Sequence, residues 1–190
     1  MKTYITLLLL FISSIIYSQD NYTITQGSKT LTWSGKAAVG GYAPEGTLQI
    51  RKATAVYHDN TLQSLEITVD MTSLYQENKR LMGHLRDKDF FHVKKYKTAT
   101  FVLTEAINTD TTTNTLVGYM TIKDTKHKEN VKATISIQGD TITITFDHKM
   151  DRTVYGVTYN SPSIFKSIKE NAIADDFTLK GTLVFTKNNI

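Results

Sequence analysis

Apolar and polar residues alternate along most of the chain from residue 21 onward. A period of two is typical of strands that bury one face and expose the other. The pattern predicts about eight strands, taken from the segments 22–24, 31–33, 48–57, 62–71, 99–103, 116–122, 131–137, 142–146 and 177–185. Short connections rich in Gly, Asn and Asp, such as Gly139-Asp140, favour antiparallel hairpins. We therefore expect an all-β fold, a single antiparallel barrel whose interior is either just filled by side chains or able to hold one small ligand.

Two segments break the alternation. Charges and bulky apolar residues mix too irregularly for a strand in 83–91, which predicts a short helix near residues 77–90 that ends in the pair Phe90 and Phe91. Aromatic residues are spaced irregularly among Gly, Asn, Ser and Pro farther on, which predicts a long loop near residues 151–176. A connection of this length in a small barrel is typically a lid, a rim or a binding loop.

The amino terminus has the pattern of a secretory signal peptide. Lys2 precedes an apolar run from Tyr4 to Tyr17, and the small or polar Ser18 and Gln19 follow. The run is too short to span a bilayer comfortably. We therefore predict a signal peptide over residues 1–19 and one barrel domain over residues 20–190, exported to a periplasm or secreted. No transmembrane segment is expected in the mature chain.

The composition excludes several classes of protein. The chain has no cysteine, which excludes a disulfide framework, a thiolate metal site and a cysteine nucleophile. Its net charge of +4 falls to +3 without Lys2, because the segment 1–18 holds no acidic residue. That balance is too mild to indicate nucleic-acid binding.

No catalytic or metal-binding pattern emerges. There is no Gly-x-Ser-x-Gly elbow, and the neighbours Asp175 and Asp176 would point to opposite sides of a strand, so we expect no enzyme activity. His84, Asp87, Asp89 and His92 are ligand types at compact spacing, but no thiolate or HxxxH-like pattern supports a metal site and none is predicted. Two other interpretations stay open: these side chains hold the loop in place, or His84 and Arg86 meet a polar or anionic lipid head.

Three blocks of sequence resemble the YceI family, the lipocalin-like exported proteins that bind polyisoprenoid lipids. They are DMTSL at 70–74, GHLRDKDFF at 83–91 with KYKTATF at 95–101, and the segment 151–176, which begins DRTVYGV. Three features depart from the usual family pattern: Lys97 replaces a proline, Asp87 replaces a small residue, and the segment 123–127 is unusually polar. The first two bear on loop geometry and head-group contacts.

The resemblance implies a lipocalin-like barrel that holds a lipid in a long apolar pore, with no catalytic residue to transfer. We therefore expect an exported protein that transports, stores or sequesters a polyisoprenoid or other long-chain amphiphile, and no cofactor besides that lipid. The residues expected to contact it are Trp33, Leu48, Met71, Leu81, His84, Leu85, Arg86, Phe90, Phe91, Phe101, Met120, Phe146, Tyr155 and Phe165. The alternative is an interaction protein without a ligand, whose barrel is filled by side chains such as Phe101 and Phe185. A homodimer also stays open.

Overall fold

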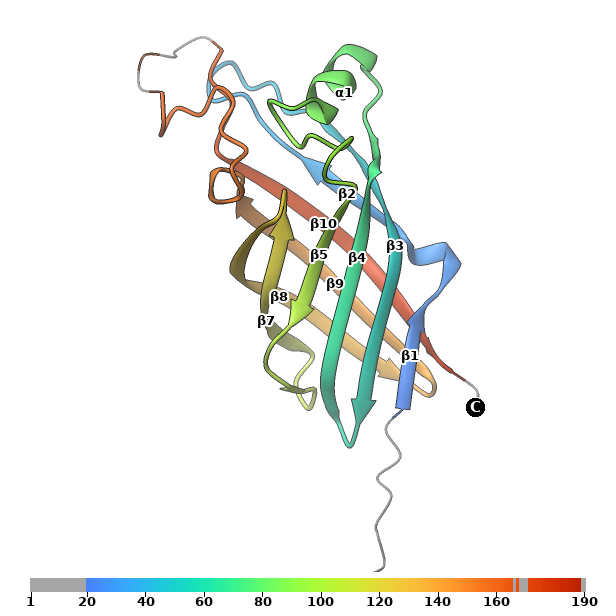
Figure 1. The fold of residues 1–190 in the computed structure, drawn as a ribbon. Helices are drawn as coiled ribbons and strands as arrows, with labels where there is room; N and C mark the ends of the chain where they lie inside the picture. Colours follow the sequence, from blue (N-terminus) through green and yellow to red (C-terminus); the bar gives the residue numbers. More distant parts are fainter. Residues whose placement is uncertain (1–19, 166, 168–170, 189–190) are drawn as a thin grey trace, which may run out of the picture.

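The computed structural model describes residues 20–165, 167 and 171–188. The predicted signal peptide, residues 1–19, lies outside them. Eight antiparallel strands close into one barrel (Figure 1), in the order β3-β2-β10-β9-β8-β7-β5-β4, and β4 pairs again with β3. These strands are β2 (Thr30–Ser34), β3 (Glu45–His58), β4 (Thr61–Tyr75), β5 (Thr98–Leu103), β7 (Thr113–Ile122), β8 (Thr125–Gln138), β9 (Thr141–Asp151) and β10 (Asp176–Lys187). The predicted all-β antiparallel barrel is confirmed.

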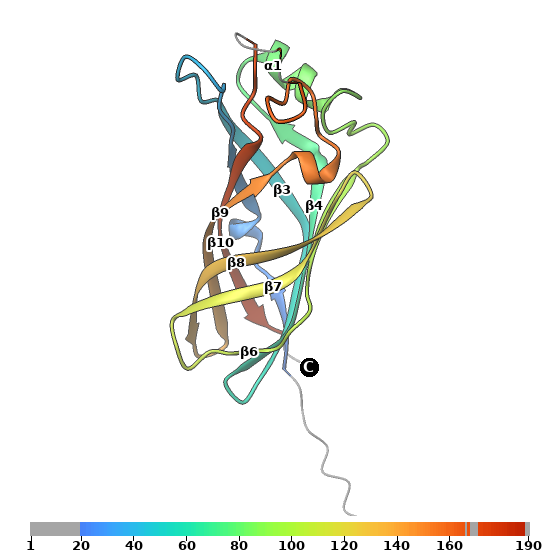
Figure 2. The same cartoon turned by 90° about the vertical axis from the view of Figure 1, so that its left-hand side faces the viewer.

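The barrel has two unlike ends, seen from two sides in Figures 1 and 2. The mouth is formed by the connecting segments 35–44, 76–97 and 152–175 and by the turn 123–124, where Nζ of Lys123 donates to the carbonyl of Gly156. The lower end is formed by the turns 59–60 and 139–140 and the segment 104–112. It also carries β1 (Asp20–Ile24), which pairs with both β3 and β10, the 3-10 turn η1 (Gln26–Ser28), and β6 (Ile107–Asn108), which pairs with the start of β4.

Two-residue turns join several strands. Asp59 and Asn60 have positive φ angles of 46° and 55°, and Lys123 and Asp124 have 51° and 59°. Tight hairpins require this left-handed backbone, which Asn and Asp tolerate. The turn at 123–124 makes β8 start at Thr125, not at the predicted 131. Its polar first half still pairs with β7 because the ladder is made by backbone groups, which need no apolar side chain.

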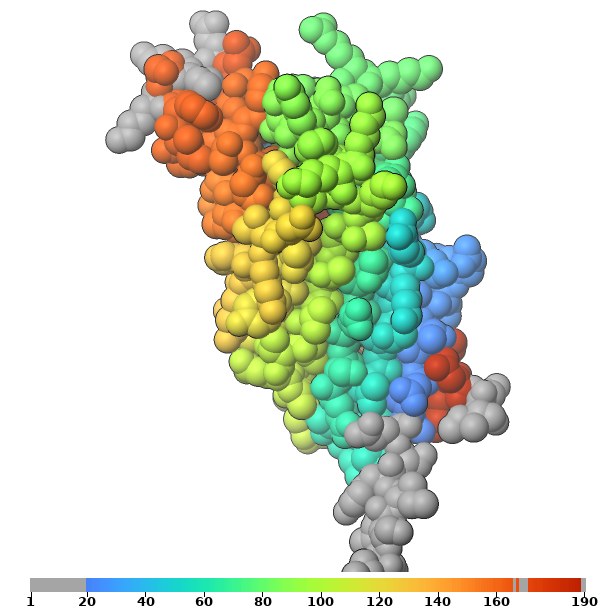
Figure 3. Space-filling model, in the orientation of Figure 1, coloured from blue at the N-terminus to red at the C-terminus, as the bar shows by residue number. Residues whose placement is uncertain are grey.

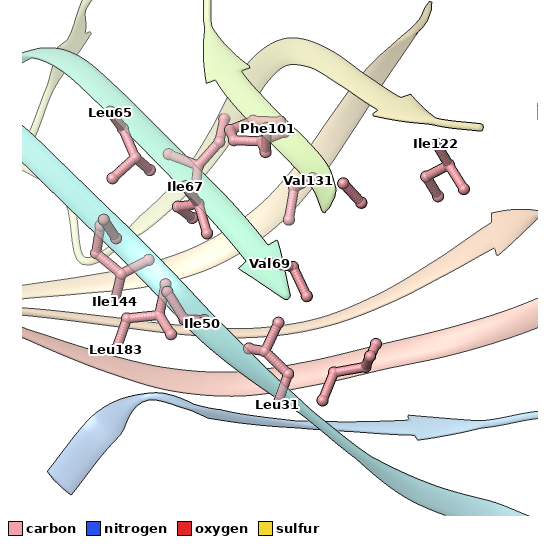
Figure 4. Close-up of a cluster of buried hydrophobic side chains, with 14 of the residues drawn as sticks. Leu31, Ile50, Leu65, Ile67, Val69, Phe101, Ile122, Val131, Ile144 and Leu183 are labelled. Atoms are coloured by element: carbon pink, nitrogen blue, oxygen red, sulfur yellow. The ribbon is translucent and has the colours of Figure 1, made fainter. Parts of the chain in front are cut away.

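The inward positions of the strands form the core (Figure 4). Leu65, Ile67 and Val69 of β4 are buried, and they point toward residues of other strands, such as Ile144 and Leu183. The alternation in the sequence therefore assigned the inner and outer faces of these strands correctly.

Segment 76–97 holds the one α-helix of the described chain, α1 (Lys79–Arg86). The side chain of Asn78 caps it by accepting the backbone N–H groups of Arg80 and Leu81, at 3.0 and 3.2 Å. The helix is shorter than the predicted 77–90 because Asp87 has an extended backbone. The N–H of Phe91 then donates to the carbonyl of Leu85 at 3.1 Å, which turns the chain back under the helix.

The predicted long loop is present as segment 152–175, whose described residues include one 3-10 turn, η2 (Thr153–Tyr155). The N–H of Arg152 donates to the carbonyl of Asp175 at 2.8 Å, which joins the two ends of the loop. A bridge between Ala37 and Ile173 ties the loop to segment 35–44. None of the described helices has the length and apolar character needed to cross a membrane.

Candidate functional site

An apolar cavity of about 210 Å³ occupies the half of the barrel nearest the mouth. Many residues line this modest volume, so the cavity is long and narrow. The lining residues nearest the lower end are Leu65, Leu116, Ile144 and Leu183. At the other end, Lys36 and Tyr42 line the cavity and are also exposed to solvent, which shows that the cavity opens at the mouth.

The lower half of the barrel is filled. Tyr22, Leu62, Ile142 and Phe185 are each at most 4% exposed, and none of them lines the cavity. Side chains from four different strands therefore close this end. The two interpretations of the interior, hollow or filled, each describe one half of the molecule.

Two glycines in the wall let aromatic rings lie flat against it. A Cβ added at Gly118 would lie 2.5 Å from Cζ of Phe101, and one added at Gly46 would lie 2.7 Å from Cζ2 of Trp33. Both rings line the cavity. Each ring occupies the space that a Cβ would take, so these two wall positions require glycine.

Segment 76–97 covers the cavity at the mouth. Leu81, Leu85, Phe90 and Phe91 of this segment all line the cavity. The His84 ring lies 5.2 Å from that of Phe90, and 4.6 Å from that of Tyr159 in the long loop. The two segments lie side by side at the mouth in Figure 3, where they are green and orange.

Eleven of the fourteen expected contact residues line the cavity: Trp33, Leu48, Met71, Leu81, His84, Leu85, Phe90, Phe91, Phe101, Met120 and Phe146. Three lie elsewhere. Arg86 donates from its guanidinium to the carbonyl of Thr72 at 2.6 Å, so it fastens α1 to β4. Tyr155 is buried but does not line the cavity, and Phe165 is 45% exposed on the long loop. Contact with a lipid stays a prediction for all fourteen.

Arg152 is a lining residue that the sequence did not single out. Its side chain is buried, and its guanidinium donates to the carbonyls of Ala174, Val157 and Ile173 at 3.0, 2.6 and 2.8 Å. Burial lowers the pKa of the guanidinium from its ordinary value, although Asp175, 3.7 Å away, acts in the opposite direction. Arg152 therefore holds the long loop closed from the inside.

A second polar group lies in the wall between β8 and β9. Glu129 accepts a hydrogen bond from the hydroxyl of Tyr155 at 2.5 Å, and its other oxygen lies 3.0 Å from Nε2 of His148. Nδ1 of His127 is 3.6 Å from the same carboxylate. Burial, together with the bond to Glu129, raises the pKa of Tyr155, so the phenol stays protonated and donates. The group ties η2 to the barrel.

Few polar side chains line the cavity. They are Lys36, His84, His148, Arg152 and Asp176, with the hydroxyl of Tyr42 and the indole of Trp33. Among the residues that the structure describes, no group of three or more His, Asp or Glu side chains is placed to hold a metal ion. A ligand in this cavity would meet an apolar wall along most of its length and polar groups mainly toward the mouth.

The YceI-like domain model matches residues 22–185. This chain belongs to the YceI family. The resemblance carried by the three sequence blocks is thereby confirmed. No curated protein matches the sequence.

Solved structures show the same fold. BcnA of Burkholderia cenocepacia is 22% identical, with a TM-score of 0.64 over 82% of this chain and 94% of that one. A polyisoprenoid binding domain from Saccharophagus degradans, implicated in plant cell wall breakdown, is 9% identical, with a TM-score of 0.66 over 88% and 98%. The YceI protein of Campylobacter jejuni is 21% identical, with a TM-score of 0.59 over 75% and 85%.

Two members of the polar group around Glu129, Glu129 itself and His148, could have been found from the strand pattern of this YceI-family barrel. Glu129 has the same parity as the inward Val131 and Ala133, and His148 has the same parity as Ile144. Extending the alternation by one or two steps places both inside the barrel. Arg152 and Tyr155 offered no such signal, because they lie outside any strand.

Proposed function

We propose that this protein is an exported lipid-binding protein that holds a polyisoprenoid or another long-chain amphiphile, for transport, storage or sequestration. The observation that carries the proposal is the long apolar cavity that opens at one end of the barrel. Clefts of this kind suit ligands that bury most of their surface in an apolar wall. The Saccharophagus domain, which shares the fold, supports a polyisoprenoid as the ligand class.

The walls should supply most of the affinity. A lipid tail that buries about 500 Å² of apolar surface gains about 12 kcal/mol at 25 cal/mol per Å². Association and ordering take back a large part of that free energy. One solvent-exposed ion pair adds only about 0–1 kcal/mol. The polar groups near the mouth therefore have more influence on which head group is accepted than on how tightly the lipid is held.

The ligand should enter with its tail toward the lower end. Leu65, Leu116 and Ile144 surround the inner end of the cavity, whereas Lys36 and His84 lie toward the opening. A tail that points inward leaves the polar head near the side chains that can bind it. The indole N–H of Trp33 is buried without a hydrogen-bond partner among the described residues, and a ligand oxygen would satisfy it.

Native mass spectrometry of the purified protein, followed by solvent extraction and lipid analysis, tests the proposal. We expect a discrete hydrophobic adduct on the wild-type protein. Ala99→Phe, which adds a ring to the cavity wall, should abolish the adduct. Val102→Phe is the matched control, because Val102 lies on the same strand but is 43% exposed on the outer face, and it should keep the adduct.

Failure of added polyisoprenoids and fatty acids to bind the apo protein would contradict the proposal. Comparable melting temperatures of the two variants would show that loss of the adduct is not loss of the fold. The export part is tested separately. The protein should be recovered outside the cytoplasm and begin near Gln19 or Asp20 by mass, and a protein found only in the cytoplasm with an intact amino terminus would contradict export.

A further inference from the structure

Exposed large apolar side chains gather at the mouth. Among the described residues six are exposed, and five of them belong to the mouth segments or to the adjoining end of β4: Val39, Tyr42, Tyr75, Ile164 and Phe165. Each is between 45% and 63% exposed. The sixth, Val102, lies on the outer wall. Exposed apolar groups concentrated in this way mark an interaction surface.

These side chains surround the opening of the cavity. They come from three separate parts of the chain, and Tyr42 is both exposed and part of the cavity lining. The bridge between Ala37 and Ile173 holds two of the segments together, and all of them lie at the α1 end of the barrel in Figures 1 and 2. The exposed apolar tips are therefore continuous with the apolar interior.

The mouth is also basic. Segment 76–97 contains seven lysine and arginine residues against three acidic residues. Six of the basic side chains are exposed, and none of the six forms an ion pair with a described acidic side chain: Lys79, Arg80, Lys88, Lys94, Lys95 and Lys97. The turns and loop of the lower end carry Asp59, Glu105, Asp110 and Asp140 instead. Charge is therefore separated along the barrel axis.

We propose that the mouth docks on the surface of an anionic phospholipid bilayer. The apolar tips would enter the head-group region while the basic side chains of segment 76–97 face the lipid phosphates, the two attractions that hold a protein at a membrane surface. Docking in this orientation places the cavity opening against the bilayer, so a lipid tail passes into the barrel without crossing water. That use of the surface rests on the proposed function, but docking itself needs no bound ligand.

Flotation with phospholipid vesicles tests docking on the delipidated protein. The wild-type protein should float with vesicles of phosphatidylcholine and phosphatidylglycerol, and bind pure phosphatidylcholine vesicles at least about tenfold more weakly. Tyr42→Ser with Phe165→Ser should weaken binding to anionic vesicles about tenfold. Lys79→Glu with Arg80→Glu should weaken it at least as much and reduce its dependence on salt.

Matched variants on the barrel wall serve as controls. Val102→Ser removes the exposed apolar side chain that lies away from the mouth, and Lys52→Glu with Lys132→Glu reverses two exposed charges on β3 and β8. Both should bind vesicles like the wild-type protein. Equal losses in the wall and mouth variants would overturn the proposal.

Two further results would also overturn docking. One is absence of vesicle binding by a wild-type protein that still retains a lipid adduct, which would leave the proposed function standing. The other comes from sedimentation velocity on the same variants. If the mouth substitutions abolish a dimer and leave vesicle binding unchanged, the mouth contacts a second copy of the chain.

Discussion

The two ends of the barrel are built from the same alternating strands, yet only one of them is filled. Phe185 and Ile142 are fully buried and close the lower end, whereas Phe101 and Phe146 also face inward and line a cavity. In the middle of β7, Gly118 leaves the space over it to the ring of Phe101. An inward-facing aromatic residue therefore does not by itself fill the barrel. Whether it does depends also on the residues of the wall next to its ring, such as Gly118 beside Phe101.

The largest expected difference between the two ends lies in their stability to truncation. Phe185→Ala removes a ring from a fully packed site and should lower the free energy of unfolding by about 3–5 kcal/mol. Phe101→Ala enlarges a space that already exists, so its loss should be less than half of that, since the ring has fewer packing contacts to lose. Urea unfolding of the delipidated proteins measures the loss of unfolding free energy in each variant. Equal losses would show that the two ends of the barrel are packed alike.

Arg152→Met tests how the mouth is held closed. The change leaves three carbonyl groups of the long loop without their donor and should cost about 2–3 kcal/mol. Arg152→Lys should recover little, because an ammonium group lacks the planar fork of donors. Thermal unfolding gives the stability, and hydrogen exchange at the Ile173 amide reports on the loop.

Arg51→Met, on the outer wall, is the control and should change stability by less than about 1 kcal/mol. Unchanged exchange at Ile173 would show that Arg152 does not secure the loop.

Two tyrosine hydroxyls sharpen the comparison at smaller scale. Tyr155→Phe, toward the mouth, removes a bond to the Glu129 carboxylate and should cost about 1.5–3 kcal/mol. Tyr57→Phe, at the lower end, removes a bond to the hydroxyl of Thr109 and should cost about 1 kcal/mol. Chemical denaturation of the two variants side by side decides the order. A larger loss for Tyr57→Phe would show that the Glu129 group does not fasten η2.

The smallest effect concerns acid. Hydrogen bonds from Lys149 and Lys36 lower the pKa of Asp176 below its ordinary value of 3.8, against the effect of burial, and the two lysine nitrogens lie 2.9 and 3.2 Å from its carboxylate. A lowered pKa in the folded state adds stability above the ordinary value, and that stability is lost as pH falls through the folded pKa. The contribution should be at most about 1 kcal/mol because the lysines are exposed.

The stability difference between wild type and Asp176→Asn should therefore be present at neutral pH and shrink below pH 3.8. Equilibrium unfolding at a series of pH values gives this difference. A gap that grows on acidification would contradict the assigned role. At the lower end Lys187 and Asp20 form an ion pair, with the nitrogen 2.7 Å from the carboxylate. The free energy of unfolding of Asp20→Asn, measured in the same way, compares this pair with the one at the mouth.

The sequence by itself determined the antiparallel barrel, the inner faces of strands such as β4, β9 and β10, the turns at 59–60 and 139–140, and membership of the YceI family. The strand faces and the turns depend on neighbouring residues alone. A period of two assigns the faces, and Asn, Asp and Gly tolerate the left-handed backbone conformation that a tight hairpin needs. It also placed most of the cavity lining, because residues such as Met71 and Phe101 follow that period.

Only the tertiary structure decided how far the cavity extends and what holds its mouth closed. Alternation says that a side chain faces inward, but not whether a side chain from a distant strand meets it. Phe185 is fully buried beside its register partner Ile142 and does not line the cavity, while Phe101 lies over Gly118 and does line it. Arg152 likewise acquires its role from carbonyls more than twenty residues away, at Ala174 and Ile173. Such contacts depend on which strands the closed barrel brings together.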